Sequence, residues 1–218
     1  MDRRAWRIGA LAWVAGEVDT YGYLSLGHVF VSHMTGNAGV LTIALVQHRF
    51  GEAFHRGIAV PLFFAGALLG AALVESADDA RQVARAFIVE ALLLAGVTAF
   101  AATGGSSASG WRQLMMLLLL SGSMGLQNAA LTHPGTRGTH STHLTGPLTD
   151  LATDVVRWVV PRRRDACDRS RVAGRIARVV GFALGGVCGA ILFAAAPVAA
   201  PMLGAMVLAV VATRSPGG

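Results

Sequence analysis

Long apolar runs limit what this chain can fold into more than any other feature of its sequence. A bilayer core about 30 Å thick requires roughly 20 predominantly apolar residues for each crossing helix. Three runs have about that length, at residues 58–74, 83–102 and 114–131. The chain is 54% hydrophobic and only 14% charged, a composition that excludes a soluble globular domain, a disordered chain and a collagen. The sequence therefore predicts an all-α polytopic transmembrane bundle surrounded by lipid.

A fourth run extends over residues 179–213 without a single charged side chain. As one helix it would be roughly 50 Å long at 1.5 Å per residue, which is too long for one crossing. Pro197 and Pro201 lie near its middle, and proline disrupts the interior of a helix. We therefore expect a hairpin of two transmembrane helices.

The N-terminal run, residues 6–26, also has spanning length, although Glu17 and Asp19 lie in its second half. The arginines that precede it resemble the start of a signal peptide, but no clear small-x-small cleavage site follows the apolar part. We expect this run to be the first membrane span.

Two segments, residues 28–48 and 139–160, are long enough to cross but hold His, Thr, Asn or Asp in mid-segment. Counting both as spans gives eight crossings, and counting both as re-entrant gives six. The sequence thus predicts six to eight segments.

The distribution of arginine predicts orientation. All 18 basic residues are arginines, and they are concentrated in residues 1–7 and 162–178, beside apolar segments. Clusters of this kind mark cytoplasmic loops. We expect both termini and the loop at residues 162–178 to be cytoplasmic, and we expect no nucleic-acid partner. The two cysteines, Cys167 and Cys188, do not form a disulfide framework.

Small residues recur at helical spacing in two apolar runs. Gly66 and Gly70 form one such pair, and Gly181, Gly185 and Gly189 extend the spacing over two turns. Small-xxx-small patterns let helix backbones approach closely. We assign these stripes to helix packing or to a subunit interface of a homo-oligomer.

The chain also contains an internal repeat. The hexapeptide SHMTGN at residues 32–37 is echoed half a chain later by THLTGP at residues 142–147, and Asp19 lies opposite Asn128 in the same comparison. Each copy is followed by an apolar continuation, a charged loop and two hydrophobic segments. The sequence predicts two related halves, residues 1–104 and 105–218, within one membrane unit.

The repeated motif is unlike an ordinary lipid-facing helix. Hydroxyl and imidazole groups are costly in hydrocarbon, and glycine followed by Asn37 or Pro147 weakens a helix. Paired interruptions in corresponding positions of two halves are typical of a transporter binding site. We therefore expect interrupted helices at both copies of the motif.

Three stretches of sequence, GEVDTYGYLSLGHVFVSHMTGN, GLQNAAL and THSTHLTGPLTDL, resemble the YoaK family, also called DUF1275. The resemblance covers nearly the whole chain and implies a bacterial inner-membrane protein with about six helices; it implies no particular activity. The positions that match the family are Asp19, Thr35, Gly36, Asn37, Gln127, Asn128, His143, Thr145 and Gly146. Pro147 stands where the first half has Asn37, so the two copies are unequal.

The leading functional hypothesis is a permease or channel for a small polar solute or ion, with its site between the two interrupted segments. His33 and His143 would bind or exchange a proton, and Asp19 would supply charge. The solute would contact Thr35, Thr145, Asn37, Gln127 and Asn128, beside Gly36 and Gly146. Alternatives are a scaffold whose polar motifs only join helices and, less favoured, a membrane-embedded enzyme.

No enzyme motif is present, and we expect neither catalysis nor a cofactor. The histidines lack the cysteine or carboxylate partners that metal sites require, so we expect no metal at His28, His33, His133, His140 or His143. Glu90 is expected to snorkel or to pair locally.

Overall fold

The computed structural model describes residues 3–75, 80–104, 110–132, 144–159 and 169–214, and within them it contains helices and no strands. The helices are α1 (Arg3–Ser25), α2 (Met34–Val46), α3 (Phe50–Glu75), α4 (Ala80–Ala102), α5 (Trp111–Thr132), α6 (Thr145–Val159), α7 (Arg169–Ala195) and α8 (Ala200–Thr213). The prediction of an all-α membrane bundle is confirmed.

Four of these helices, α3, α4, α5 and α7, are long and apolar enough to cross a membrane. They contain the apolar runs that the sequence places at residues 58–74, 83–102 and 114–131 and the first part of the run at 179–213. That last run is divided into two helices as predicted, because α7 ends at Ala195 and α8 begins at Ala200; α8 packs mainly on α4 and little on α7, and it is shorter than the four candidate spans. Pro197 lies in the turn, and Pro201 lies in the first turn of α8, where its missing N–H is not needed.

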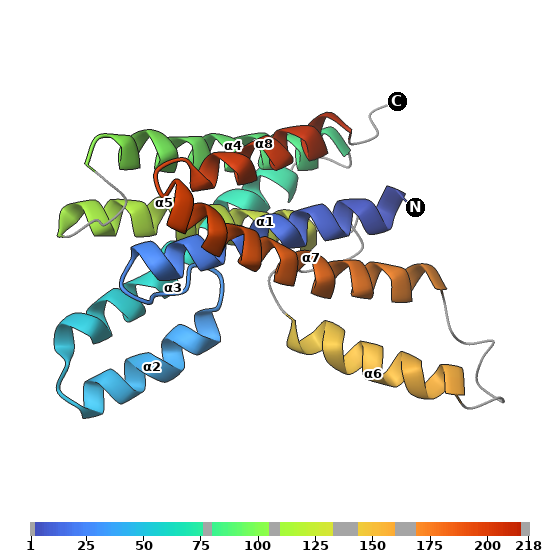
Figure 1. Cartoon of the computed structure of the whole chain (residues 1–218), viewed down its shortest axis with the longest axis horizontal. Helices are drawn as coiled ribbons and strands as arrows, with labels where there is room; N and C mark the ends of the chain where they lie inside the picture. The colour runs from blue at the N-terminus through green and yellow to red at the C-terminus, as the bar shows by residue number, and fades with distance from the viewer. Residues whose placement is uncertain (1–2, 76–79, 105–109, 133–143, 160–168, 215–218) are drawn as a thin grey trace.

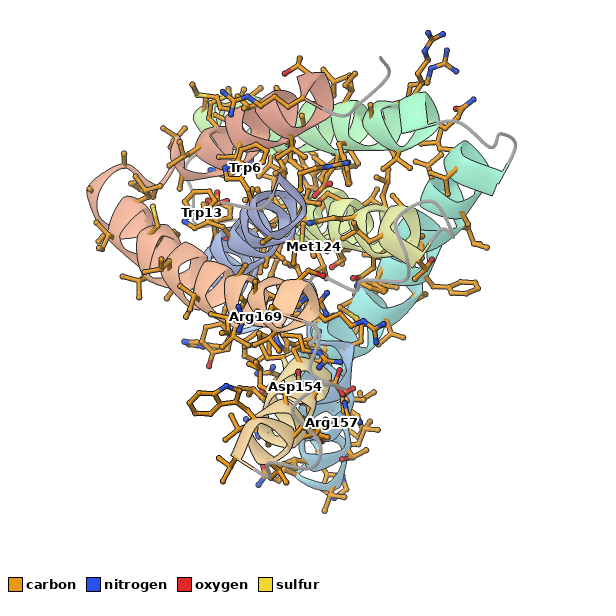
Figure 2. All side chains as sticks on the ribbon, turned by 90° about the vertical axis from the view of Figure 1, so that its right-hand side faces the viewer. Trp6, Trp13, Met124, Asp154, Arg157 and Arg169 are labelled. Carbon is orange, nitrogen blue, oxygen red and sulfur yellow. The ribbon has the colours of Figure 1, made fainter. Side chains whose placement is uncertain are left out.

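Helix α1 lies at the centre of the bundle. In Figure 2 α1 is seen nearly end-on at the centre, with α7, α8 and α5 around it. The other close pairs are α3 with α5 and α4 with α8. The inner faces of these helices form one apolar core, which includes Val14, Phe87, Leu94, Met124 and Leu208.

Both segments that the sequence predicts to be interrupted form short helices outside the main bundle. Figure 1 shows α2 and α6 diverging from the other helices on the same side of the molecule. Helix α2 has 13 residues and α6 has 15, so they extend roughly 20 and 22 Å at 1.5 Å per residue. Both lengths are shorter than a bilayer core of about 30 Å.

Glycines bring the central helices into backbone contact. A Cβ atom added at Gly16 would collide with the carbonyl oxygen of Phe182 on α7, and one at Gly125 would collide with that of Phe63 on α3. The predicted glycine stripes lie at these same interfaces: Gly66 faces Gly122 on α5, and Gly185 faces Trp13 on α1. Both stripes therefore pack helices of this chain against each other.

Candidate functional site

Asp19 on α1 organises the segment that connects α1 to α2. Its side chain is 3% exposed. Oδ1 accepts hydrogen bonds from the backbone N–H groups of Val31 at 3.0 Å and Ser32 at 2.8 Å, while Oδ2 lies 2.6 Å from Nδ1 of His33. One carboxylate thus satisfies two backbone donors and fixes the imidazole where α2 begins.

Asn37, in the first turn of α2, closes the same segment from the other side. Its amide Nδ2 donates to the carbonyl oxygen of Phe30 at 2.6 Å, and its Oδ1 accepts from the N–H of Phe30 at 3.1 Å. The side-chain amide thus makes the same two hydrogen bonds to Phe30 as a backbone amide makes in a β-sheet, and Asn37 is fully buried. Residues 30–37 consequently form a closed turn around the Asp19 carboxylate.

His33 is the part of this cluster that reaches the surface. Its side chain is 34% exposed, and its ring packs between Phe30 and the edge of Phe182 on α7, each with a centroid separation of 5.5 Å. Nδ1 is held by Asp19, so Nε2 is the ring atom that remains for a proton or a solute. A carboxylate behind one nitrogen also strengthens the basicity of the other.

Two long side chains hold the preceding loop in place. The chain reverses direction at Gly27 and His28, whose φ angles are +68° and +64°. Arg56 on α3 donates from Nη1 to the carbonyl oxygen of His28 at 2.7 Å, and Gln113 on α5 donates to that of Leu26 at 3.1 Å. Neither Arg56 nor Gln113 was predicted as a site residue, because the contacts join positions far apart in sequence.

Gln127 contacts α1 at a different level from the cluster. Its Nε2 donates to the carbonyl oxygen of Leu11 at 2.9 Å, two turns before Asp19 and about 12 Å from it along the helix. Asn128, the next residue of α5, is 6% exposed. The structure therefore gives Gln127 a helix-joining contact and does not bring it to the Asp19 carboxylate.

The remaining predicted residues lie at the starts of the two short helices. Thr35 and Gly36 in α2 and Thr145 and Gly146 in α6 are exposed, and a Cβ atom at Gly146 would meet nothing within 4 Å. In Figure 1 the N-terminal ends of α2 and α6 point towards each other. His143 lies outside the described residues.

The N-terminal end of α2 carries no side-chain cap, because His33 makes no capping hydrogen bond. The first N–H groups of a helix have no partner within it and carry a partial positive charge. Two such ends that face each other form a place where an acceptor or a negative group is favoured.

Two further carboxyl groups are buried inside the bundle. Glu17 on α1 and Glu90 on α4 are both 0% exposed, and none of their oxygens has a hydrogen-bond partner among the described residues. The prediction that Glu90 snorkels or pairs locally is wrong, because its helix face is covered by protein along its whole length. Sequence pattern alone could not show which face of α4 is covered.

No group of three or more His, Cys, Asp or Glu side chains in the described part of the chain is arranged to hold a metal ion. Three of the histidines considered for that role, His133, His140 and His143, lie outside the described residues.

Comparison with known proteins identifies relatives. The profile of a family described as "Protein of unknown function (DUF1275)" matches residues 8–213. The chain is similar to the UPF0700 transmembrane protein YoaK of Bacillus subtilis (strain 168), with 34% identity over 155 residues. The match covers 68% of this chain and 65% of that protein. No solved structure matches the chain significantly.

Proposed function

Because the chain belongs to the DUF1275 family of membrane proteins, we propose that it is a membrane transporter for a small polar solute or ion. The observation that carries the proposal is the non-helical segment between α1 and α2. The buried Asp19 carboxylate holds this segment in place by accepting from its backbone and by contacting His33. Irregular backbone inside a membrane protein is tolerated where it lines a cavity or a solute pathway. Catalysis is not part of this proposal.

An inverted internal repeat supports it. The helix pair α1–α7 and the helix pair α5–α3 share their closest contacts position by position. Gly16 packs against the carbonyl group of Phe182, and Gly125 packs in the same way against that of Phe63. Gly185 packs against the carbonyl group of Trp13, and Gly66 packs in the same way against that of Gly122. Corresponding residues of α1 and α5 are separated by one constant number of positions in the sequence, and so are those of α3 and α7. The two interfaces are therefore equivalent. This supports the division at residues 1–104 and 105–218.

Two arginines extend the correspondence to the short helices. Arg56 and Arg175 are each the seventh residue of their helix, α3 and α7. Arg56 contacts the segment that precedes α2 through the carbonyl of His28, and Arg175 forms ion pairs with Asp154 and Asp150 of α6. Each half thus uses the same arginine to hold its own short helix or the segment before it.

The proposal takes six crossings, with α1 and the 14-residue α8 counted beside the four long apolar helices. With α2 and α6 re-entrant, each half holds three crossing helices, and an odd number inverts the second half in the membrane. The orientation that arginine predicts then places both termini in the cytoplasm of a bacterial cell. The starts of α2 and α6 would meet from opposite sides near the middle of the bilayer, where alternating-access sites lie.

The chemistry of the region between the starts of α2 and α6 suggests the class of solute. The uncapped N-terminal end of α2 and the start of α6 favour a negative or acceptor group. Thr35 and Thr145, in the first turns of these helices, supply neutral hydroxyl groups there. His33 and His143 would bind or exchange a proton with the solute. We therefore expect a small polar solute or anion.

A thermal-shift screen of the purified protein against ions and small polar metabolites tests the proposal. Beside the wild type it includes the variant His33→Ala/His143→Ala and, as a control for histidine loss elsewhere, His55→Ala. We expect a ligand that raises the melting temperature of the wild type and of His55→Ala but not of the double variant. Such a ligand should then move across proteoliposomes that contain the wild type and not across those with the double variant.

A structural scaffold is the second candidate, and it rests on a specific observation. Among the described residues, Asp19 and Asn37 bind only groups of the segment that connects α1 to α2, as residues that join helices do. Under this alternative the double variant melts earlier than wild type, and no solute shifts either protein. That result would overturn the transport proposal.

A further inference from the structure

The carboxyl groups of Glu17 and Glu90 lie on different helices of the bundle, and neither belongs to the Asp19 cluster. Glu17 leaves α1 on the face opposite Asp19, since two residues turn an α-helix by about 200°. Both side chains are 0% exposed, and all four carboxyl oxygens lack a hydrogen-bond partner among the described residues. The proposed solute site does not use these two carboxyl groups.

Glycines on the neighbouring helices make the space around Glu17. A Cβ atom at Gly204 on α8 would lie 2.7 Å from Oε2 of Glu17 and 3.2 Å from the side chain of Leu94 on α4. A Cβ atom at Gly189 on α7 would lie 2.7 Å from the Glu17 carbonyl oxygen. The carboxyl group therefore lies where α1, α4 and α8 meet, while α7 packs against the backbone of Glu17.

Glu90 approaches the same region from α4. It precedes Leu94 by four residues, and side chains at that spacing lie on one face of a helix. Leu94 is in contact range of Gly204, beside the Glu17 carboxyl. Both acids thus point into the covered interior that α8 shares with α1 and α4.

Few other titratable groups face this interior. On α1, Tyr21 follows Glu17 by one turn, and its buried hydroxyl has no partner among the described residues. On α7 the nearest is Cys188, which interacts electrostatically with Glu17. Helix α8 carries none between Ala200 and Thr213.

The basic residues lie towards the helix ends. On α4 they are Arg81 and Arg85, and on α5 only Arg112. Helix α3 has its charged and histidine residues in its first two turns and at its last residue. Neither glutamate forms an ion pair with a described residue, so no positive side chain compensates these carboxyls.

The absence of a partner restricts what can occupy these groups. A carboxylate that is buried without a donor or a countercharge is strongly unfavourable. A metal cation would require several oxygen ligands, and no such group is present among the described residues. A proton needs no further ligand and removes the charge.

The second half of the chain shows that packing does not require the acid. Leu126 on α5 is the counterpart of Glu17, and it is equally buried. Gly70 approaches the Leu126 carbonyl with a Cβ distance of 2.5 Å, as Gly189 approaches that of Glu17 with 2.7 Å. The same interface forms with a leucine, so the carboxyl of Glu17 serves something other than the interface.

We propose that Glu17 and Glu90 each bind a proton in the interior of the bundle and exchange it with bulk water. That the bound proton is the coupling ion of transport rests on the proposed function. The proton binding itself requires no solute. Intramembrane acids with this environment are typical of proton relays in pumps and transporters.

Infrared spectroscopy of the purified full-length protein tests the proposal. A protonated carboxyl has a carbonyl stretch distinct from that of a carboxylate, and the band shifts when the bound proton is replaced by deuterium. We expect such bands in the wild type, their shift on transfer to D2O, and their decrease as the pH is raised.

The variants assign the bands. Glu17→Gln and Glu90→Gln should each remove one component, whereas Asp150→Asn, which changes an exposed carboxylate, should leave both. Glu17→Leu repeats the test with the side chain that the equivalent position carries, so a folding defect of the glutamine variant does not decide the result. The proposal is overturned if both glutamate variants keep the bands.

Protonated bands that neither exchange with D2O nor respond to pH would overturn the proposal as well, because the protons would then be permanently enclosed. This outcome is independent of the solute screen. A protein without any ligand response can still show exchangeable carboxyl protons, and a protein with a solute response can lack them.

Discussion

The Asp19 carboxylate replaces the backbone partners that residues 31 and 32 lose where the helix is interrupted. It accepts from the N–H groups of Val31 and Ser32 and binds His33. The sequence indicates both Asp19 and His33 as candidate site residues, since His33 recurs as His143 and Asp19 lies opposite Asn128, but it cannot show that Asp19 binds the backbone. A hydrogen bond to main chain leaves no residue-type signal at Val31.

Removal of this carboxylate should destabilise the protein strongly. Asp19→Ala leaves two buried N–H groups without an acceptor, and each costs about 1–3 kcal/mol. We expect a large decrease in melting temperature in detergent and a smaller one for Asp19→Asn, whose oxygen still accepts. The control is Asp150→Asn, since Asp150 is 56% exposed. Equal melting temperatures for Asp19→Ala and the wild type would contradict the assigned contacts.

Glu17→Leu should have the opposite effect. The substitution replaces an unpartnered buried carboxyl with the residue of the equivalent position, Leu126, and burial of an unsatisfied polar group costs about 1–3 kcal/mol. We expect the melting temperature to rise. A decrease, measured in the same detergent as wild type, would mean that the carboxyl has a stabilising partner.

At the scale of elements, the apolar runs predicted most of the helices because spanning length is a strong signal in a chain with so few charges. The break between α7 and α8 could be predicted because proline marks it. The sequence could not show that Gly66 and Gly185 face carbonyl groups of other helices, since a small-residue stripe does not identify its partner. The same limit explains the incorrect prediction for Glu90.

The close helix contacts give a prediction at this scale. Gly125→Ala should push α5 away from α3, because the added Cβ atom would overlap the carbonyl oxygen of Phe63. Overpacking of this kind costs about 1–3 kcal/mol or more.

Gly96→Ala is the matched control, since a Cβ atom there meets nothing within 4 Å. Alanine favours a helix by roughly 1 kcal/mol over glycine, so this variant should melt at or above the wild-type temperature. Thermal melts of both variants would contradict the described interface if Gly125→Ala were as stable as Gly96→Ala.

For the whole molecule, the sequence left six and eight crossings open, because polar residues within a segment fit both a span and a re-entrant helix. The direction of the N-terminal ends of α2 and α6 (Figure 1) favours six. Helix length does not decide the number, since α8 has 14 residues and α6 has 15. The end of α2 and the end of α4 then lie on the same side of the membrane, opposite the C-terminus.

Cysteine labelling in cells tests this topology. In a background without Cys167 and Cys188, Gln47→Cys and Thr103→Cys should react with a membrane-impermeant maleimide added outside. Thr213→Cys should react only after the cells are opened. Eight crossings would instead make Gln47 and Thr103 inaccessible from outside.

The glycine contacts also decide which parts of the molecule can move as units. Each of the two tightest helix pairs, α1 with α7 and α3 with α5, contains one helix from each sequence half. The halves are therefore interlaced, and a rocking motion of residues 1–104 against residues 105–218 would separate both pairs at once. Rigid-body movement preserves tightly packed interfaces. A large motion that keeps these interfaces intact must accordingly divide the protein between the α1–α7 pair and the α3–α5 pair. The first pair would carry α6, which packs on α7, and the second would carry α2, which packs on α3.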